Sequence, residues 1–184
     1  MKIKEIILKA LPFTGYGELV ESLEKMTSSS TSSEPINRLT RIAVNVLGEI
    51  AEGYVPLVTE ETVSVTNGKI SYGSLSQDVA KVISVCDENG VPVSYEAEAD
   101  GIKTGVSSAK VRYRYFPVKY RLDGEVYFDG PPVSAKTVAY GIAGEYFMTE
   151  GDYALSNVWN RMFYESLSAQ LKRKGLKLKG RRWI

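Results

Sequence analysis

The residues that could do chemistry in this sequence are few, and none of them is a histidine. The 184 residues include no His, which is the usual general base near neutral pH and a common metal ligand. Serine–histidine and cysteine–histidine hydrolysis, histidine-ligated metals and histidine phosphotransfer are therefore excluded. Carboxylate pairs, serine–lysine pairs and Mg²⁺ held by carboxylates remain as possible chemistry.

The nearest approach to a carboxylate pair is Glu60-Glu61, with Glu96, Glu98 and Asp100 scattered further along the chain. Neighbouring residues of a strand point to opposite sides, so the first two carboxylates would not share a site. Gly15-Tyr16-Gly17 lacks the third glycine and the preceding strand of a dinucleotide-binding loop, and the sequence has no Gly-Lys-Ser/Thr phosphate-binding motif. We expect no enzyme activity, no cofactor and no metal.

Composition adds few constraints on function. The formal net charge is +1, with 43% hydrophobic and 24% charged residues, values typical of a globular protein with no overall preference for a polyanion. No apolar run approaches the ~18 residues of a membrane span, and the N-terminus is too charged for a secretion signal, so we expect a cytoplasmic product. A lone Cys86 permits neither an intramolecular disulfide nor a multi-thiolate zinc site, and we expect it to fill the core.

Two basic stretches could bind a partner. In Lys110-Val111-Arg112-Tyr113-Arg114-Tyr115 cations alternate with apolar residues, which predicts a strand with one basic and one apolar face. Basic grooves with stacking aromatic residues bind single-stranded nucleic acid. Alternation alone also produces a polar outside and an aromatic inside, and we favour that interpretation.

The second basic stretch is the C-terminal one, where residues 171–184 hold seven basic residues and no acidic residue. An idle, solvated tail would not need the apolar residues found here, and Trp with Arg is typical of protein-interface anchors. We therefore expect this stretch to dock on a partner chain. The residues that we expect to make the contact are Lys172, Arg173, Lys174, Leu176, Leu178, Arg181, Arg182, Trp183 and Ile184.

Helical periodicity is present at both ends of the chain. Two short helices end near Gly15 and Met26, and a long central helix begins after Ser33 and ends near Gly53. Ser134 and Asp152 can each cap a further helix, and so short a turn between these two helices predicts antiparallel packing. The last helix has a wide apolar stripe made of Leu155, Val158, Trp159, Met162, Phe163, Leu167 and Leu171.

From Thr59 to about Tyr127 the period changes from 3.6 to 2. Asn67-Gly68 predicts a type I′ hairpin turn, and Asp87-Glu88-Asn89-Gly90 a second turn. We therefore expect one α+β domain, built as a helical bundle (residues 1–58 and 133–174) with an inserted antiparallel β module (59–132) and a basic extended C-terminal arm (175–184). The length favours one domain over two independent ones.

This order of elements, read with three stretches of sequence, resembles the head-to-tail connector (adaptor or neck) proteins of tailed bacteriophages, notably the tail tubular protein A type of short-tailed phages. No catalytic motif defines this family. The stretches that carry the resemblance are Asn67-Gly68-Lys69-Ile70-Ser71-Tyr72, Val79-Ala80-Lys81-Val82-Ile83-Ser84-Val85, and Val138-Ala139-Tyr140-Gly141-Ile142-Ala143-Gly144-Glu145-Tyr146-Phe147 through Trp159.

The resemblance implies a structural protein of the virion neck, made in the host cytoplasm. It implies a homo-oligomeric ring of twelve copies between the portal protein and the next tail or neck protein. The basic face of Lys110, Arg112 and Arg114, if it lines the channel, would make unspecific contact with passing DNA, and the sequence leads us to expect no membrane partner. The helices and the C-terminal arm would face the portal, and the β module the next tail component. A head-completion adaptor of a longer-tailed phage fits the compact length too, and the alternative function is a nucleic-acid-binding module that uses the basic strand face and the C-terminal tail.

Overall fold

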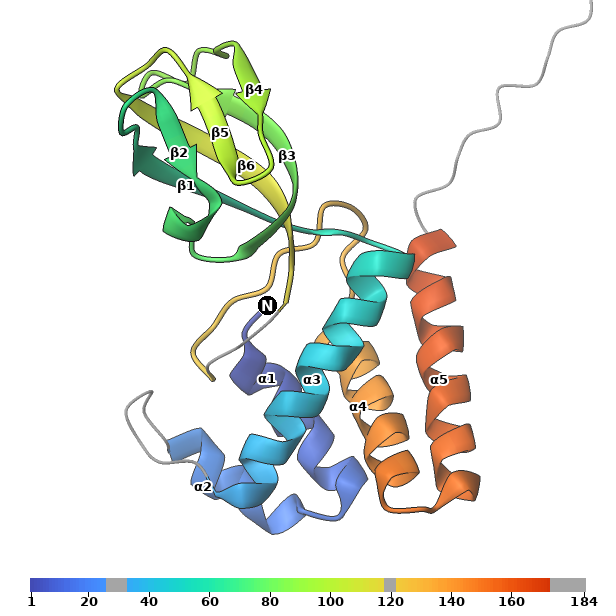
Figure 1. Ribbon diagram of the computed structural model, residues 1–184. Coiled ribbons are helices and arrows are strands. Elements are labelled where there is room, and N and C mark those ends of the chain that lie inside the picture. Colours follow the sequence, from blue (N-terminus) through green and yellow to red (C-terminus); the bar gives the residue numbers. More distant parts are fainter. Residues whose placement is uncertain (26–32, 118–121, 173–184) are drawn as a thin grey trace, which may run out of the picture.

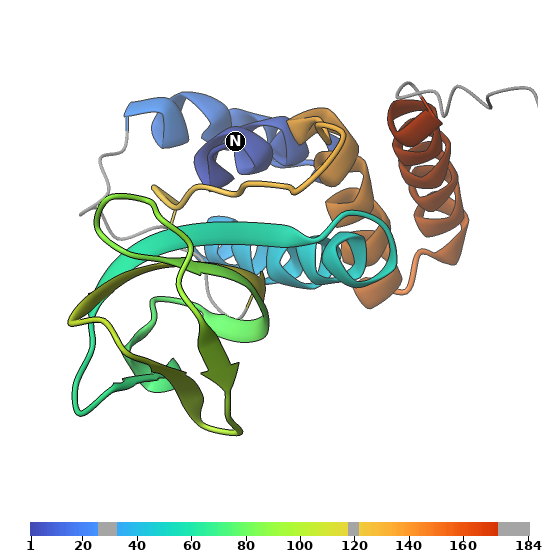
Figure 2. The ribbon, with the colours of Figure 1, turned by 90° about the horizontal axis from the view of Figure 1, so that it is seen from above.

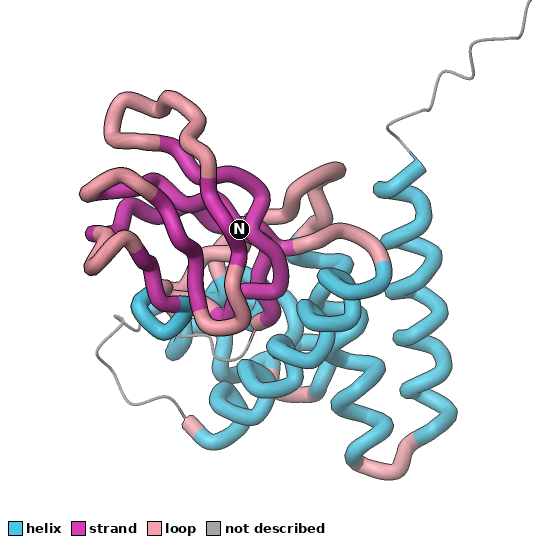
Figure 3. Tube along the Cα trace, turned by 45° about the horizontal axis from the view of Figure 1, so that its top comes forward, coloured by secondary structure: helices cyan, strands magenta, loops and turns pink. Residues whose placement is uncertain are grey.

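A computed structural model describes residues 1–25, 33–117 and 122–172 of the chain (Figure 1). Its helices gather on one side of the molecule and its strands on the other, as the colouring by secondary structure in Figure 3 also shows. The helices are α1 (Ile3–Ala10), α2 (Val20–Lys25), α3 (Glu34–Gly53), α4 (Ala135–Thr149) and α5 (Tyr153–Lys172), with short 3-10 turns at Leu11–Thr14, Gly17–Leu19 and Tyr72–Ser74.

The strands form two antiparallel sheets of three strands each. In the first sheet β6 (Ser108–Phe116) lies between β1 (Leu57–Ser64) and β3 (Asp78–Cys86). In the second sheet β5 (Gly101–Thr104) lies between β2 (Lys69–Ser71) and β4 (Tyr95–Ala97). The central strand of the first sheet, β6, is therefore also the last strand in the order of the sequence.

The prediction of a helical bundle with an inserted β module is wrong, although the α+β class is right. The strands form two substantial sheets, and their inward side chains belong to the same hydrophobic core as those of the helices. The prediction failed because the region of period 2 was assigned to an insert between the helices, whereas its alternating apolar side chains form a large part of the hydrophobic core. Strand residues in that core include Leu57, Ile70, Val85, Ile102, Val111 and Tyr113.

A further connection between strands and helices is an extended strap, residues 122–129. Its backbone accepts hydrogen bonds from the N–H groups of Ile3 and Lys4, at 3.0 and 2.9 Å. At the other end of the strap, the N–H group of Val58 in β1 donates to the carbonyl of Tyr127 at 3.0 Å. The strap therefore joins the start of α1 to the start of β1, which no local sequence pattern predicts.

Several local predictions are confirmed. Asn67 and Gly68 have φ angles of 53° and 74°, as a type I′ turn requires. The side chains of Ser134 and Asp152 accept hydrogen bonds from the N–H groups of Thr137 and Leu155, at 3.2 and 3.0 Å, and so cap α4 and α5. The start of α3 after Ser33 is confirmed as well, although the hydroxyl of Ser33 makes no capping hydrogen bond.

The packing of α5 against α4 depends on small and polar residues. The hydroxyl of Ser156 donates to the carbonyl of Gly144 at 2.8 Å, near the turn that joins the two helices. At the other end of the pair, the hydroxyls of Thr137 and Ser166 lie 2.8 Å apart, and Phe163 is buried between these polar contacts. Figure 2 shows α5 as the outermost helix, beside α4.

Two burial predictions are wrong. Leu155 and Val158, expected on the apolar stripe of the last helix, are 42% and 43% exposed, because α5 packs mainly on α4 and turns only a narrow side to it. Cys86 is only half-buried, since it ends β3 at the margin of the first sheet. Within the described residues, no helix is both long and apolar enough to cross a membrane.

Candidate functional site

The basic strand face predicted from the sequence is present on β6. Lys110, Arg112 and Arg114 share one side of the strand, where their side chains are 47%, 45% and 44% exposed. The intervening residues on the other side are buried, as the alternating pattern predicts. The structure therefore brings the three cations together on an accessible surface.

Carboxylates of the same chain neutralise much of this face. The ammonium of Lys110 lies 2.7 Å from Oε1 of Glu60, and hydrogen bonding to that carboxylate raises the pKa of Lys110. The guanidinium groups of Arg112 and Arg114 lie 3.2 and 3.9 Å from the two carboxylate oxygens of Asp129, at the end of the strap. Because exposed ion pairs are weak, phosphates can compete for these cations, but each of the three already has a carboxylate partner.

The two neighbouring carboxylates of β1 point to opposite sides of the sheet, as predicted. Glu60 faces Lys110, whereas Glu61 accepts hydrogen bonds from the hydroxyl of Tyr113 and, at 2.8 Å, from that of Ser76. Burial, and then the hydrogen bond with Glu61, raises the pKa of Tyr113 to about 12. The two carboxylates therefore hold separate structural contacts and do not form a general acid–base pair.

The other scattered acidic residues do not gather into a site either. Glu98 and Asp100 both pair with Lys69, at 2.7 and 2.6 Å from its ammonium. Hydrogen bonding to Lys69 lowers the pKa of Asp100. Across residues 1–25, 33–117 and 122–172, no group of three or more His, Cys, Asp and Glu residues is placed to hold a metal ion.

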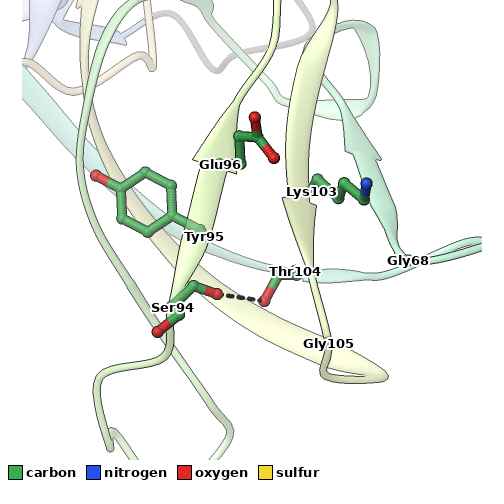
Figure 4. A pocket seen from close by; sticks show the side chains of 7 residues that line it. All are labelled: Gly68, Ser94, Tyr95, Glu96, Lys103, Thr104 and Gly105. Atoms are coloured by element: carbon green, nitrogen blue, oxygen red, sulfur yellow. Dashed lines mark hydrogen bonds between the residues drawn. The ribbon is translucent and has the colours of Figure 1, made fainter.

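A cavity of about 450 Å³ opens on the second sheet, beside β4 and β5 (Figure 4). Glu96 and Lys103 lie on neighbouring strands at its wall, and the hydroxyl of Thr104 donates to the carbonyl of Ser94 at 3.3 Å. This lining can hydrogen-bond to a polar ligand, but the Thr104 hydroxyl is bonded to a carbonyl and not to a base that would activate it. The lining residues are Gly68, Ser94, Tyr95, Glu96, Lys103, Thr104 and Gly105.

A second cavity, of about 290 Å³, lies where the end of α3 meets β3 and β6. Arg114 and Lys81 supply cations to its lining, and Phe116, which is 45% exposed, supplies an aromatic ring. Glu52 on the side of α3 introduces an opposing carboxylate. This mixture is suited to polar contacts with a partner and does not resemble a reaction centre.

The predicted contact residues of the C-terminal stretch fall almost entirely outside the described part of the chain. Lys172 is the last residue of α5. The remaining predicted residues, which lie outside the described residues, are Arg173, Lys174, Leu176, Leu178, Arg181, Arg182, Trp183 and Ile184.

Sequence reasoning missed an exposed apolar surface where α4 turns into α5, here called the turn patch. It consists of Met148, Tyr153, Leu155 and Val158, which are 52%, 67%, 42% and 43% exposed. A signal was present in the sequence, since the apolar stripe predicted for α5 is wider than contact with a single neighbouring helix can cover. Leu155 and Val158 are three residues apart and share one side of α5, whereas Met148 and Tyr153 flank the turn. Exposed large apolar side chains are found at protein–protein contacts.

No protein-family model matches the chain, and no curated protein gives a significant match to it.

Proposed function

We propose that this chain is a subunit of the ring that connects head and tail in a tailed bacteriophage. It would lie in the virion neck, between the portal protein and the next tail or neck protein, and contribute assembly contacts without catalysis. The proposal begins from the resemblance in element order and sequence described above. The observation that carries it furthest is the turn patch.

The turn patch supports assembly because it is apolar, exposed and placed at the end of an outer helix. Its four side chains expose between 42% and 67% of their surface and lie within eleven residues of one another in the sequence, whereas other exposed apolar residues, such as Val91 and Tyr127, lie elsewhere along the chain. In Figure 1 the α4–α5 turn lies at the end of the helices that is farther from the sheets. A subunit that assembles with other proteins would bury such a surface.

The basic strand face supports the alternative, a nucleic-acid-binding module, less well. Its three cations already have carboxylate partners in Glu60 and Asp129. Binding of phosphates would have to displace these partners, and the gain from counterion release would be reduced accordingly. Weak, unspecific contact with DNA inside a channel remains compatible with this arrangement.

The first test is a mass measurement by light scattering on the purified chain, alone and mixed with a portal protein from the same source. Moderate salt and the absence of DNA remove nucleic acid as a bridge. We expect the chain to join the portal as a ring of defined stoichiometry. Failure to bind the portal, together with DNA binding that weakens steeply with salt and with charge reversal at Arg112 and Arg114, would replace this proposal with the nucleic-acid module.

A further inference from the structure

We propose that the turn patch of one copy of this chain binds residues 173–184 of a second copy. The inference rests on the proposed function in one respect, namely that copies of this chain assemble with each other. It assigns that contact to two different surfaces, one at each end of α5.

The first argument is chemical complementarity. The turn patch offers Met148, Tyr153, Leu155 and Val158, and residues 173–184 include two leucines, a tryptophan and an isoleucine among their cations. In the sequence between Lys136 and Arg161 the charged residues are all acidic, namely Glu145, Glu150 and Asp152. Cations close to this stretch include Arg38 of α3, which pairs with Glu150, and Arg161, one turn after Val158. An apolar surface with acidic neighbours thus has a basic, apolar counterpart in the same sequence.

The second argument is the charge of the whole chain. Residues 173–184 hold six Lys or Arg residues and no Asp or Glu, so the other 172 residues carry 22 acidic and 17 basic side chains. The net charge of the whole chain is therefore close to zero because the acidic residues of positions 1–172 are balanced by the basic residues of positions 173–184. Opposite charges on two surfaces of one chain favour contact between copies and speed their association.

The acidic residues at the patch are not equally available. The carboxylate of Glu150 lies 2.6 Å from a guanidinium nitrogen of Arg38, and Glu145 accepts a hydrogen bond from Asn45 at 2.9 Å. Asp152 caps α5 through one carboxylate oxygen, which accepts a hydrogen bond from the N–H group of Leu155. Asp152 is exposed to solvent. Apolar burial must therefore supply most of the affinity, and the charges mainly set orientation and rate.

The third argument is distance along α5. Residues 173–184 follow the last residue of α5, whereas the turn patch surrounds its first turns. A helix of 20 residues spans about 30 Å, and twelve extended residues reach about 40 Å. To reach the patch of its own copy, the segment would have to run back along the helix fully extended, with only its last few residues left to make contact. A second copy imposes no such restriction.

Two different surfaces make the contact heterologous, which means that each copy can bind one neighbour on each side. Repetition of such a contact closes into a ring when the rotation between neighbours permits it, and otherwise forms a filament. A self-complementary dimer would instead pair two identical patches and stop at two copies. The proposed contact is therefore of the kind that a connector ring requires.

The test uses two full-length variants that each lack one half of the contact. One carries Tyr153→Ser and Leu155→Ser in the patch, and the other carries Trp183→Ser and Ile184→Ser in the segment. The patch side chains are exposed, so the changes should leave the fold intact, which circular dichroism and urea unfolding can verify. Val91→Ser, at another exposed apolar residue (56% exposed) in the loop between β3 and β4, is the matched control.

Sedimentation velocity over a range of protein concentrations should show self-association of the unmodified chain and of the Val91→Ser control. Each of the two contact variants should associate at least about tenfold more weakly, because removing one buried large apolar side chain costs roughly 1.5–3 kcal/mol. A mixture of the two variants should form 1:1 dimers and nothing larger, since one intact patch meets one intact segment.

Three outcomes would overturn the proposal. The patch variant could associate as well as the Val91→Ser control, the mixed variants could fail to pair, or all proteins could remain monomeric at every concentration, as expected for a segment that docks on its own copy. None of these outcomes depends on the portal protein. Portal binding without this self-association would retain the proposed function and remove only this inference.

Discussion

Replacing Gly144 by alanine tests how closely α4 and α5 are packed. A Cβ atom at this position would lie 2.1 Å from Oδ1 and 2.8 Å from Cγ of Asn160, and 3.3 Å from its backbone nitrogen. The first two distances are shorter than any stable contact, so the Asn160 side chain must turn away or α5 must shift. Turning away would break the hydrogen bond that Asn160 donates to Ser156, 3.3 Å long.

The expected magnitude combines two opposing effects. Overpacking in a well-filled interface costs about 1–3 kcal/mol, while replacing glycine by alanine inside a helix gains about 1 kcal/mol. We therefore expect Gly144→Ala to lower the free energy of unfolding by up to about 2 kcal/mol. In an Asn160→Ala background the two shortest contacts are absent, and the same substitution should be nearly neutral.

Urea unfolding of the two single variants and the double variant gives this coupling directly. Gly48→Ala in α3 is the matched control, because a Cβ there meets only Cγ of Pro117 at 3.8 Å and should stabilise or leave the protein unchanged. Equal losses from Gly144→Ala in both backgrounds, or no loss in either, would show that α4 and α5 are not packed as closely as described.

Three further predictions follow from the geometry. Asp129→Asn should release the two arginines of the basic face and raise the affinity for a labelled single-stranded oligonucleotide, most clearly at low salt, in fluorescence anisotropy; unchanged affinity would show that Asp129 does not mask the face. The pKa of Tyr113 is raised to about 12, against 10 in the unfolded chain, so its contribution to stability is complete below pH 10 and is lost as the pH rises towards 12. The urea midpoints of the wild type and of Tyr113→Phe should therefore converge between pH 10 and pH 12. A constant difference between the two midpoints would contradict the assignment. Phe163→Ala should destabilise by roughly 3–5 kcal/mol because the ring is buried, whereas Tyr153→Ser, at a residue 67% exposed, should change stability by less than about 0.5 kcal/mol in the same thermal unfolding assay.

Local patterns in the sequence predicted local structure well. The hydrophobic spacing of residues 34–53 identified α3, and Asn67-Gly68 identified the hairpin turn, because in each case the determining interactions lie within a few residues of one another. The alternation along β6 likewise predicted which side chains are buried. These are short-range effects of backbone geometry and side-chain direction.

Long-range relationships were not predictable in the same way. The division of the strands into two sheets depends on β6 pairing with both β1 and β3, which are far from it in sequence. The masking of Arg112 and Arg114 depends on the strap returning Asp129 to the face of β6. A sequence pattern identifies a basic face but does not reveal which carboxylates the fold will place against it.

The exposure of Leu155 and Val158 is a second property that depends on long-range packing and that the sequence pattern did not predict. The periodicity of α5 identifies apolar residues, but only the number of neighbouring helices decides how many of them are covered. Here α5 packs mainly on α4, so part of its stripe remains outside. That mismatch is also the observation on which the proposed contact between copies depends.

The strap has a consequence for how the protein folds as it is synthesised. The backbone partners of Ile3 and Lys4 are Gly124 and Leu122. These hydrogen bonds at the start of α1 can form only after about 120 further residues have been synthesised. At a translation rate of about 5–20 residues per second, this delay lasts several seconds or more. During that time the apolar side of α1 (Ile3, Ile6, Ile7 and Ala10) has no completed core to enter. We therefore expect slow, late folding in a single step, and nascent chains that are vulnerable to aggregation until the strap has emerged from the ribosome.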